Sequence, residues 1–136
     1  MTDQPKVTVS RNGTLWWRLS NGELHRDDGP ARIDPDGSEH WRMYGRLHRD
    51  DGPAVVWSDG SEEWYQHDQL HRDDGPAVVW SDGTEYWHQH GKRHRVDGPA
   101  VTRPDGTREW WINGVLLRGF EAEVARRAWE KNGCPR

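Results

Sequence analysis

The chain has 136 residues, a formal net charge of −4 at pH 7 and a single cysteine, Cys134. This length has room for one domain, a lone cysteine excludes an internal disulfide, and the net acidity argues against a broad nucleic-acid surface. Ten tryptophans argue against a disordered chain. Because we find no signal-like or membrane-spanning apolar stretch, we expect a cytoplasmic protein with no membrane partner.

The chain opens with a pattern typical of a β-hairpin. The segment Val-Thr-Val-Ser from Val7 alternates apolar and polar side chains, and Asn12-Gly13 is a turn signal. Residues 14–19 follow as a second strand, and Asn21-Gly22 turns the chain again.

A motif then recurs every 23 residues. Residues 70–83 have the sequence L-H-R-D-D-G-P-A-V-V-W-S-D-G, a near copy begins at Leu47, and weaker copies begin at Leu24 and Arg93. Self-similarity at a fixed period is typical of repeat architectures. The sequence therefore predicts one hairpin per repeat.

Each repeat is predicted to contain a first strand opened by Gly-Pro-Ala, a two-residue Asp-Gly turn, a second strand that carries a tryptophan, and a long return loop. The first strands are residues 31–34, 54–57, 77–80 and 100–103. The turns are Asp36-Gly37, Asp59-Gly60, Asp82-Gly83 and Asp105-Gly106. The second strands are residues 38–44, 61–67, 84–90 and 107–113.

The C-terminal segment departs from the repeat. Leu116-Leu117-Arg118 replaces Leu-His-Arg, and residues 120–131 have the apolar spacing of a helix. Terminal repeats need an atypical cap. We therefore predict a single all-β domain over residues 1–136, in which 23-residue β-hairpin repeats (7–118) form an extended antiparallel meander sheet and residues 119–133 form a C-terminal capping α-helix.

The repeat resembles the MORN repeat, in particular its bacterial and phage variant. The matching residues in one unit are Asp36-Gly37, Trp41, Gly45-Arg46-Leu47-His48 and Gly52-Pro53-Ala54, and the likeness extends over residues 10–118. The resemblance implies an open antiparallel meander that grows by one hairpin per repeat. It also implies a binding or scaffolding role, and some bacterial members look like antitoxin or immunity partners.

The repeated His-Arg-Asp-Asp segment, first present as residues 25–28, has the side chains of a general base or a metal site. An enzyme or metal site is needed once, however, and this segment occurs in near-identical copies. We therefore expect a structural role, no catalytic or metal residue, and no cofactor. In this role the second aspartate of each copy accepts backbone N–H bonds, and the histidine bonds the neighbouring loop. These aspartates are Asp28, Asp51, Asp74 and Asp97.

Period-2 geometry assigns the aromatic residues to two faces. The tryptophan shared by all repeats is predicted to pack in the core; its copies are Trp41, Trp64, Trp87 and Trp110. Other aromatic residues are absent from the equivalent positions of some repeats and are predicted to form an exposed binding surface. This predicted surface comprises Trp57, Trp80, Val55, Val78, Tyr65, Tyr86 and Trp111, with Arg32 and Arg103 at its rim.

The sequence favours a non-enzymatic protein-interaction module that binds a protein partner, as an antitoxin, immunity or phage anti-defence protein does. A homodimer seam at the same surface is an alternative. A carbohydrate- or small-ligand-binding tryptophan repeat is a second alternative. An enzyme or metal site that uses the repeated His and Asp residues is a third, and single-strand nucleic-acid binding is opposed by the net acidity.

Overall fold

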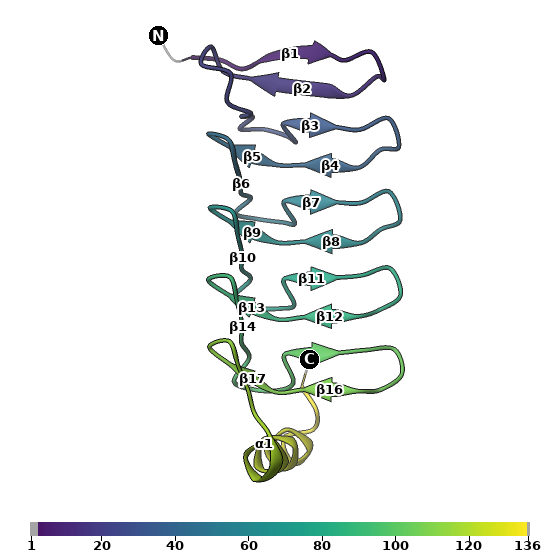
Figure 1. Cartoon of the computed structure of the whole chain (residues 1–136), viewed down its shortest axis with the longest axis vertical. Coiled ribbons are helices and arrows are strands. Elements are labelled where there is room, and N and C mark those ends of the chain that lie inside the picture. The colour runs from purple at the N-terminus through teal and green to yellow at the C-terminus, as the bar shows by residue number, and fades with distance from the viewer. Residues whose placement is uncertain (1–2, 136) are drawn as a thin grey trace. The chain divides into compact units, whose positions relative to one another are not determined.

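A computed structural model describes residues 3–135 of the chain and divides it into two compact units, Met1–Gln69 and Leu70–Arg136. Both units consist of short antiparallel strands, and a helix closes the second (Figure 1). The predicted all-β hairpin repeat with a C-terminal helix is thereby confirmed. That all repeats form a single domain stays a prediction.

Unit 1 contains an antiparallel meander in the order β1-β2-β3-β4-β7-β8, and β5 pairs with β6 in a separate small hairpin. Its strands are β1 (Lys6–Val9), β2 (Leu15–Arg18), β3 (Arg32–Ile33), β4 (Glu39–His40), β5 (Arg42–Met43), β6 (Arg46–Leu47), β7 (Val55–Val56), β8 (Glu62–Glu63) and β9 (Tyr65–Gln66). β10 (Gln69–Leu70) contains the boundary between the units.

Unit 2 repeats the arrangement with a meander β11-β12-β15-β16 and the small hairpins β13-β14 and β17-β18. Its strands are β11 (Val78–Val79), β12 (Glu85–Tyr86), β13 (His88–Gln89), β14 (Lys92–Arg93), β15 (Val101–Thr102), β16 (Arg108–Glu109), β17 (Trp111–Ile112) and β18 (Val115–Leu116). The helix α1 (Gly119–Lys131) follows at once.

The prediction of one hairpin per repeat is wrong, because the second strand breaks at its tryptophan. The N–H of Trp41 donates to the carbonyl of Ala54 at 2.6 Å, and its carbonyl accepts from the N–H of His48 at 3.1 Å. Beyond Trp41 the chain folds back on itself as β5 and β6. Each repeat therefore has two hairpins, whose turns lie at opposite ends of the repeat (Figure 1).

The turns also differ from the expected two-residue Asp-Gly type. In the first hairpin, Gly37 N–H donates to Asp34 C=O and Asp34 N–H donates to Ser38 C=O, each at 2.9 Å. With a φ of 91° at Gly37, this is a three-residue loop that ends in a left-handed glycine. Asp36 Oδ1 accepts the Ser38 N–H at 2.9 Å, which explains why an aspartate precedes the glycine.

The second hairpin is the one with a two-residue turn. Tyr44 and Gly45 both have positive φ, 49° and 82°, and join the paired residues Met43 and Arg46. Two left-handed residues define a type I′ turn, whose twist matches that of the flanking strands. The equivalent turns are His67-Asp68, His90-Gly91 and Asn113-Gly114, all with positive φ.

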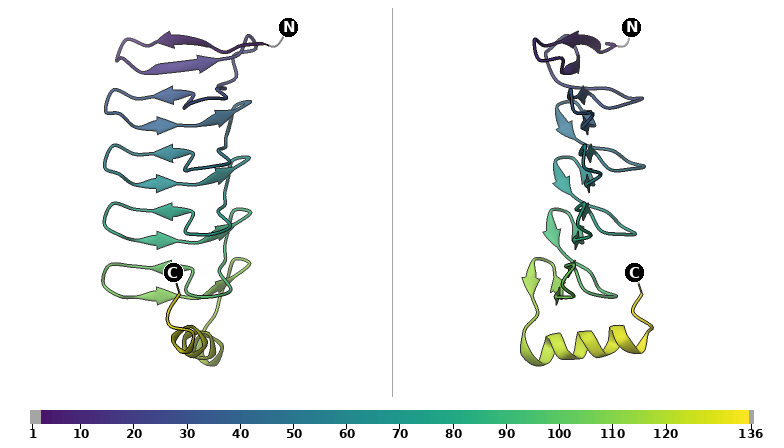
Figure 2. Two further views of the ribbon diagram at one scale, coloured as in Figure 1. Left: turned by 180° about the vertical axis from the view of Figure 1, so that it is seen from behind. Right: turned by 90° about the vertical axis from the view of Figure 1, so that its right-hand side faces the viewer.

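The core is thin and contains small side chains. Its buried apolar residues are Leu19, Ala31, Ala54, Val55, Ala77, Val78, Trp87, Ala100 and Val101. At the end of unit 2, α1 lies beside β16 and β17 (Figure 2). Its Trp129 ring meets the Trp110 ring edge-on at 6.2 Å, and its indole N–H donates to Pro135 C=O at 3.1 Å. The helix thus covers the last tryptophan of the array, as a cap should.

Candidate functional site

The repeated histidine links one repeat to the next. The Nδ1 atom of His48 accepts the backbone N–H of His67 at 3.1 Å, and its Nε2 lies 2.9 Å from Asp50 Oδ1. Because a backbone N–H can only donate, Nδ1 is unprotonated and Nε2 carries the proton that Asp50 accepts. His25, His71 and His94 accept the N–H of Tyr44, His90 and Asn113 in the same way.

The histidine also stabilises the strained turn residue of the next repeat. His67 occupies the left-handed region, which costs a non-glycine residue free energy and persists only where surrounding contacts hold the residue in place. Its N–H is bound by His48, and the two imidazole rings lie in contact at an interplanar angle of 43°, with centroids 4.5 Å apart. The predicted bond from each repeated histidine to the neighbouring loop is thereby confirmed, and a role in folding stays a prediction.

The repeated arginine is held between a tryptophan and a glycine. The guanidinium of Arg49 lies 3.7 Å from the centre of the Trp41 ring, and its Nη1 donates to Pro53 C=O at 3.1 Å. A Cβ on Gly52 would come within 2.7 Å of the guanidinium carbon. The glycine thus permits this close approach, and any side chain here would push the guanidinium away. Arg26 with Trp17, and Arg95 with Trp87, form the same stack.

The second aspartate of the segment does not accept backbone N–H bonds, so this part of the structural prediction is wrong. The side chain of Asp51 is 89 % exposed and lies 3.4 Å from the Nε of Arg49. Asp28, Asp74 and Asp97 make the same ion pair with Arg26, Arg72 and Arg95. These carboxylates therefore orient the stacked arginine from the solvent side.

The described residues contain no group of three or more His, Cys, Asp or Glu side chains placed to hold a metal ion. Three of the described hollows lie over the repeated loops, and another lies beside α1, where Glu85, Thr102, Arg108 and Trp129 line it. One of about 410 Å³ in unit 1 is lined by Glu23, Met43, Tyr44, Arg46, His48 and His67. The Nδ1 of His48 already binds backbone, so a ligand could reach this atom only by displacing a turn contact.

The face that carries Trp57 varies from repeat to repeat. Its first cross-strand row in unit 1 joins Trp16, Arg32, His40, Val55 and Glu63 by direct pairing. Trp57, Tyr65 and their equivalents lie beside this row. We call these positions the variable face: Arg32/Val55/Val78/Val101, Asp34/Trp57/Trp80/Arg103, His40/Glu63/Tyr86/Glu109 and Arg42/Tyr65/His88/Trp111.

The opposite face of the same strands varies less in chemical character. Its row in unit 1 pairs Ile33 with Glu39, and Val56 with Glu39 and Glu62. The four copies of one position are Ile33, Val56, Val79 and Thr102, and those of the other are Glu39, Glu62, Glu85 and Arg108. Variation is therefore concentrated on one side of the repeat.

In unit 1 the aromatic side chains of the variable face make polar contacts with neighbouring residues. Trp57 is 37 % exposed, its indole N–H donates to Glu63 Oε2 at 3.0 Å, and its ring meets His40 edge-on at 5.4 Å. Burial, followed by the charge of Glu63, raises the pKa of Tyr65. The phenol therefore stays neutral and can donate a hydrogen bond at physiological pH.

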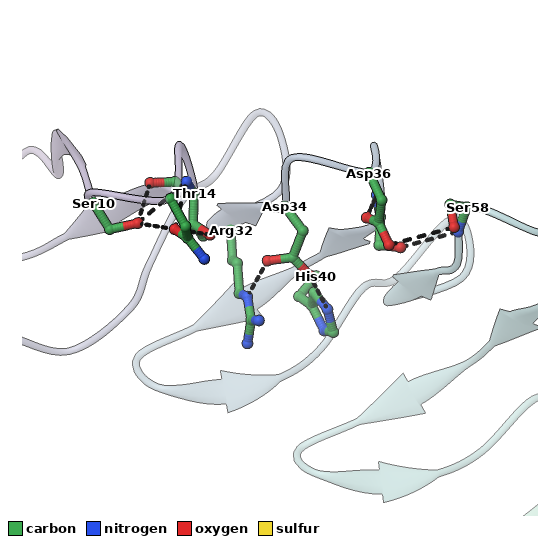
Figure 3. Close-up of polar contacts among 9 residues, drawn as sticks. Ser10, Thr14, Arg32, Asp34, Asp36, His40 and Ser58 are labelled. Atoms are coloured by element: carbon green, nitrogen blue, oxygen red, sulfur yellow. Dashed lines mark hydrogen bonds and ion pairs between the residues drawn. The ribbon is translucent and has the colours of Figure 1, made fainter.

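Asp34 connects the arginine and histidine of this face (Figure 3). Its Oδ1 accepts from Arg32 Nε at 2.6 Å, and its Oδ2 lies 3.5 Å from His40 Nε2, which is too long for a good hydrogen bond. Burial, and then the charge of Arg32, lower the pKa of His40, so this imidazole is neutral. Arg32 also lies 4.8 Å from the centre of the Trp16 ring.

In unit 2 the variable face also places charged side chains beside aromatic rings, although the residues differ from those of unit 1. Arg93 lies 5.0 Å from the centre of the Tyr86 ring and 5.1 Å from that of Trp111. Glu109 accepts from both Trp111 Nε1 at 2.8 Å and Arg103 Nη2 at 3.0 Å. Trp80 is 36 % exposed.

The two valines that the sequence assigned to the exposed surface are instead buried. Val55 is 1 % and Val78 is 3 % exposed, so neither can contact a partner. Each valine lies in a row of cross-strand pairs. Val55, for example, lies between His40 and Glu63, and the larger side chains of these two neighbours shield it from solvent. Trp57 and Trp80 are partly exposed as predicted; that they bind a partner stays a prediction.

Sequence reasoning missed two groups on this surface. Trp16 pairs with Arg32 in the first hairpin, and Arg93 lies against Tyr86 and Trp111 from the second hairpin of its repeat. Asn113-Gly114 is a strong type I′ turn signal and could have revealed the second hairpin, and with it the return of Arg93.

Comparison with known proteins adds no family. No protein-family model matches the chain, and no similar curated protein was found. Among the described residues, no helix is both long and apolar enough to span a bilayer.

Proposed function

We propose that the protein is a non-enzymatic repeat module that binds a protein partner through its variable face. The observation that supports the proposal is that the residue differences between repeats are concentrated on this face. Positions that hold the repeat together have the same residue in copy after copy. The position of Trp57, in contrast, differs between repeats: its four copies are Asp34, Trp57, Trp80 and Arg103. Repeat proteins bind through faces whose residues differ while the scaffold stays constant.

The chemistry of this face suits a protein partner. Exposed tryptophan, tyrosine and arginine are the residues enriched at binding hot spots. Trp57 and Tyr65 in unit 1, and Trp80 and Trp111 in unit 2, supply large apolar area beside ion-paired groups. Within this class, an antitoxin, immunity or phage anti-defence role is the form suggested by the MORN-like repeat.

An enzymatic role has less support. The His-Arg-Asp-Asp segments are the richest source of catalytic side chains. In the second copy, His48 and Arg49 bind backbone groups of the fold, and each is also paired with an aspartate of its own segment. A group that is required for folding in every repeat is a poor candidate for a single catalytic act.

The test is affinity capture with matched variants. Trp57→Ala and Trp80→Ala should each lose at least tenfold of a captured partner while keeping the parent's melting temperature. Glu62→Gln and Glu85→Gln lie on the opposite face and should retain it. A partner that binds all five proteins equally, or that is lost only from the glutamate variants, would contradict the proposal.

A further inference from the structure

The outer edge of β1 offers unpaired backbone groups. Among the described residues, β1 pairs with β2 and with no other strand. Its residues are exposed along the whole strand, with Val7 at 52 % and Val9 at 67 %. Asp3 binds the N–H and hydroxyl of Ser20 at 3.2 and 2.9 Å, so the preceding segment is held on the β2 side and leaves this edge open.

The register shows which backbone groups point outward. Trp17, the partner of Val7, donates its N–H to the C=O of Ala31 and accepts the N–H of His25 at its own C=O, so it makes no backbone bond to Val7. The N–H of Ser10, in contrast, donates to Thr14 C=O, which directs this residue inward. Because the direction alternates along an antiparallel strand, Lys6 and Thr8 bond β2, and Val7 and Val9 direct N–H and C=O outward.

This edge is complementary to itself. A twofold axis at Thr8 would set Val7 of one copy opposite Val9 of the other, and each such pair would exchange two backbone hydrogen bonds. Lys6 would face Ser10, so no like charges would oppose one another, and the four valine side chains would pack on one face. An axis at Val7 would instead set Val9 opposite Pro5, which has no N–H to donate.

We propose that β1 pairs antiparallel with β1 of a second copy of this chain, with the twofold axis at Thr8. The partner is the same chain because this register fills every outward donor and acceptor of Val7 and Val9 and opposes no charges. Unpaired edges that lack a charge or a bulge on their outward positions are the ones that associate. This association is independent of the variable face.

Sedimentation equilibrium of the full chain tests the pairing. The parent should approach twice its mass of 15.9 kDa as its concentration rises. Val7→Pro removes an outward N–H and leaves the bonds to β2 intact, so it should sediment as a folded monomer. Val7→Thr keeps the N–H and should still dimerise. A parent that remains monomeric, or a Val7→Pro variant that dimerises like the parent, would overturn the proposal.

Cross-linking tests the register without relying on proline. In a Cys134→Ser background, Thr8→Cys should oxidise to a disulfide-linked dimer, because the two Thr8 residues would be directly opposite with Cα atoms about 4.5 Å apart. Val7→Cys in the same background faces Val9 of the other copy and should cross-link at least tenfold more slowly. Equal rates for the two variants would overturn the proposed register.

Discussion

The guanidinium of Arg49 lies 3.7 Å above the Trp41 ring and closes against Gly52, where a Cβ would come within 2.7 Å. Arg49 therefore stands between a residue of the preceding hairpin and the turn of its own loop. This contact explains why the repeat contains tryptophan, arginine and glycine at fixed spacing. Since Gly52 is not in the left-handed region, its lack of a side chain serves packing rather than turn conformation.

Gly52→Ala should lower the free energy of unfolding by about 2 kcal/mol, because the added methyl group forces Arg49 off the Trp41 ring. Urea unfolding monitored by tryptophan fluorescence measures this loss. The matched control is Gly52→Ala in an Arg49→Ala background, where no guanidinium remains to be displaced and the added cost should nearly vanish. If Gly52→Ala lowers the free energy of unfolding equally in both backgrounds, the contact with Arg49 is not the cause.

The exposed aspartate and the stacked arginine should differ in their effect on stability. Arg49→Ala removes the contact with Trp41 and the bond to Pro53, which should cost about 2 kcal/mol. Asp51→Ala removes a largely solvated ion pair and should cost less than about 1 kcal/mol. Melting curves of the two variants decide between them. A larger loss for Asp51→Ala than for Arg49→Ala would contradict this ranking.

Stability should decrease in mild acid, and His88 should account for part of the decrease. Burial, and then the nearby charge of Arg93, lower the pKa of His88 below its usual 6.5. The unfolded chain therefore takes up this proton more readily than the folded one, so stability is full above about pH 6.5 and is lost as the pH falls through the folded pKa. His88→Gln should show a smaller drop in melting temperature between pH 7.5 and 5.5. An unchanged drop would contradict this assignment.

Trp129→Ala should loosen the end of unit 2. This side chain covers Trp110, receives Arg108 at 5.0 Å from its ring centre, and binds Pro135 C=O. Amide hydrogen exchange should accelerate most in α1, β17 and β18. Phe120→Ala is the control on the same helix, because Phe120 is 82 % exposed and its loss should leave exchange unchanged. If both variants exchange alike, Trp129 is not the capping contact.

The sequence predicted the repeat, its period and the C-terminal helix, because turn residues and periodicity are local signals. It did not predict the break in each second strand. Trp41 continues the apolar alternation of a strand, so this pattern hides the break, and its bonds to Ala54 and His48 show that the chain leaves the meander there. The turn signal Asn113-Gly114 was a local hint of the second hairpin.

The candidate site was predicted in part for a related reason. Alternation along the strand correctly grouped Trp57 with Val55, but it could not show that Val55 is buried within its row of cross-strand pairs. The aspartates of the repeated segment were assigned to backbone N–H groups because that is their common role in turns. Here the turn already has its bonds, and the arginine beside each aspartate needs a partner.

The most direct test of the proposed function is hydroxyl-radical footprinting of the protein with and without a captured partner. This method reports the solvent exposure of individual side chains, and tryptophan and tyrosine react well. On binding, Trp57, Tyr65, Trp80 or Trp111 should become at least severalfold less reactive, while Tyr44 and Phe120, which lie outside the variable face, should not change. Protection of Tyr44 or Phe120 with unchanged reactivity at Trp57 and Trp80 would contradict the assignment of the variable face as the binding surface.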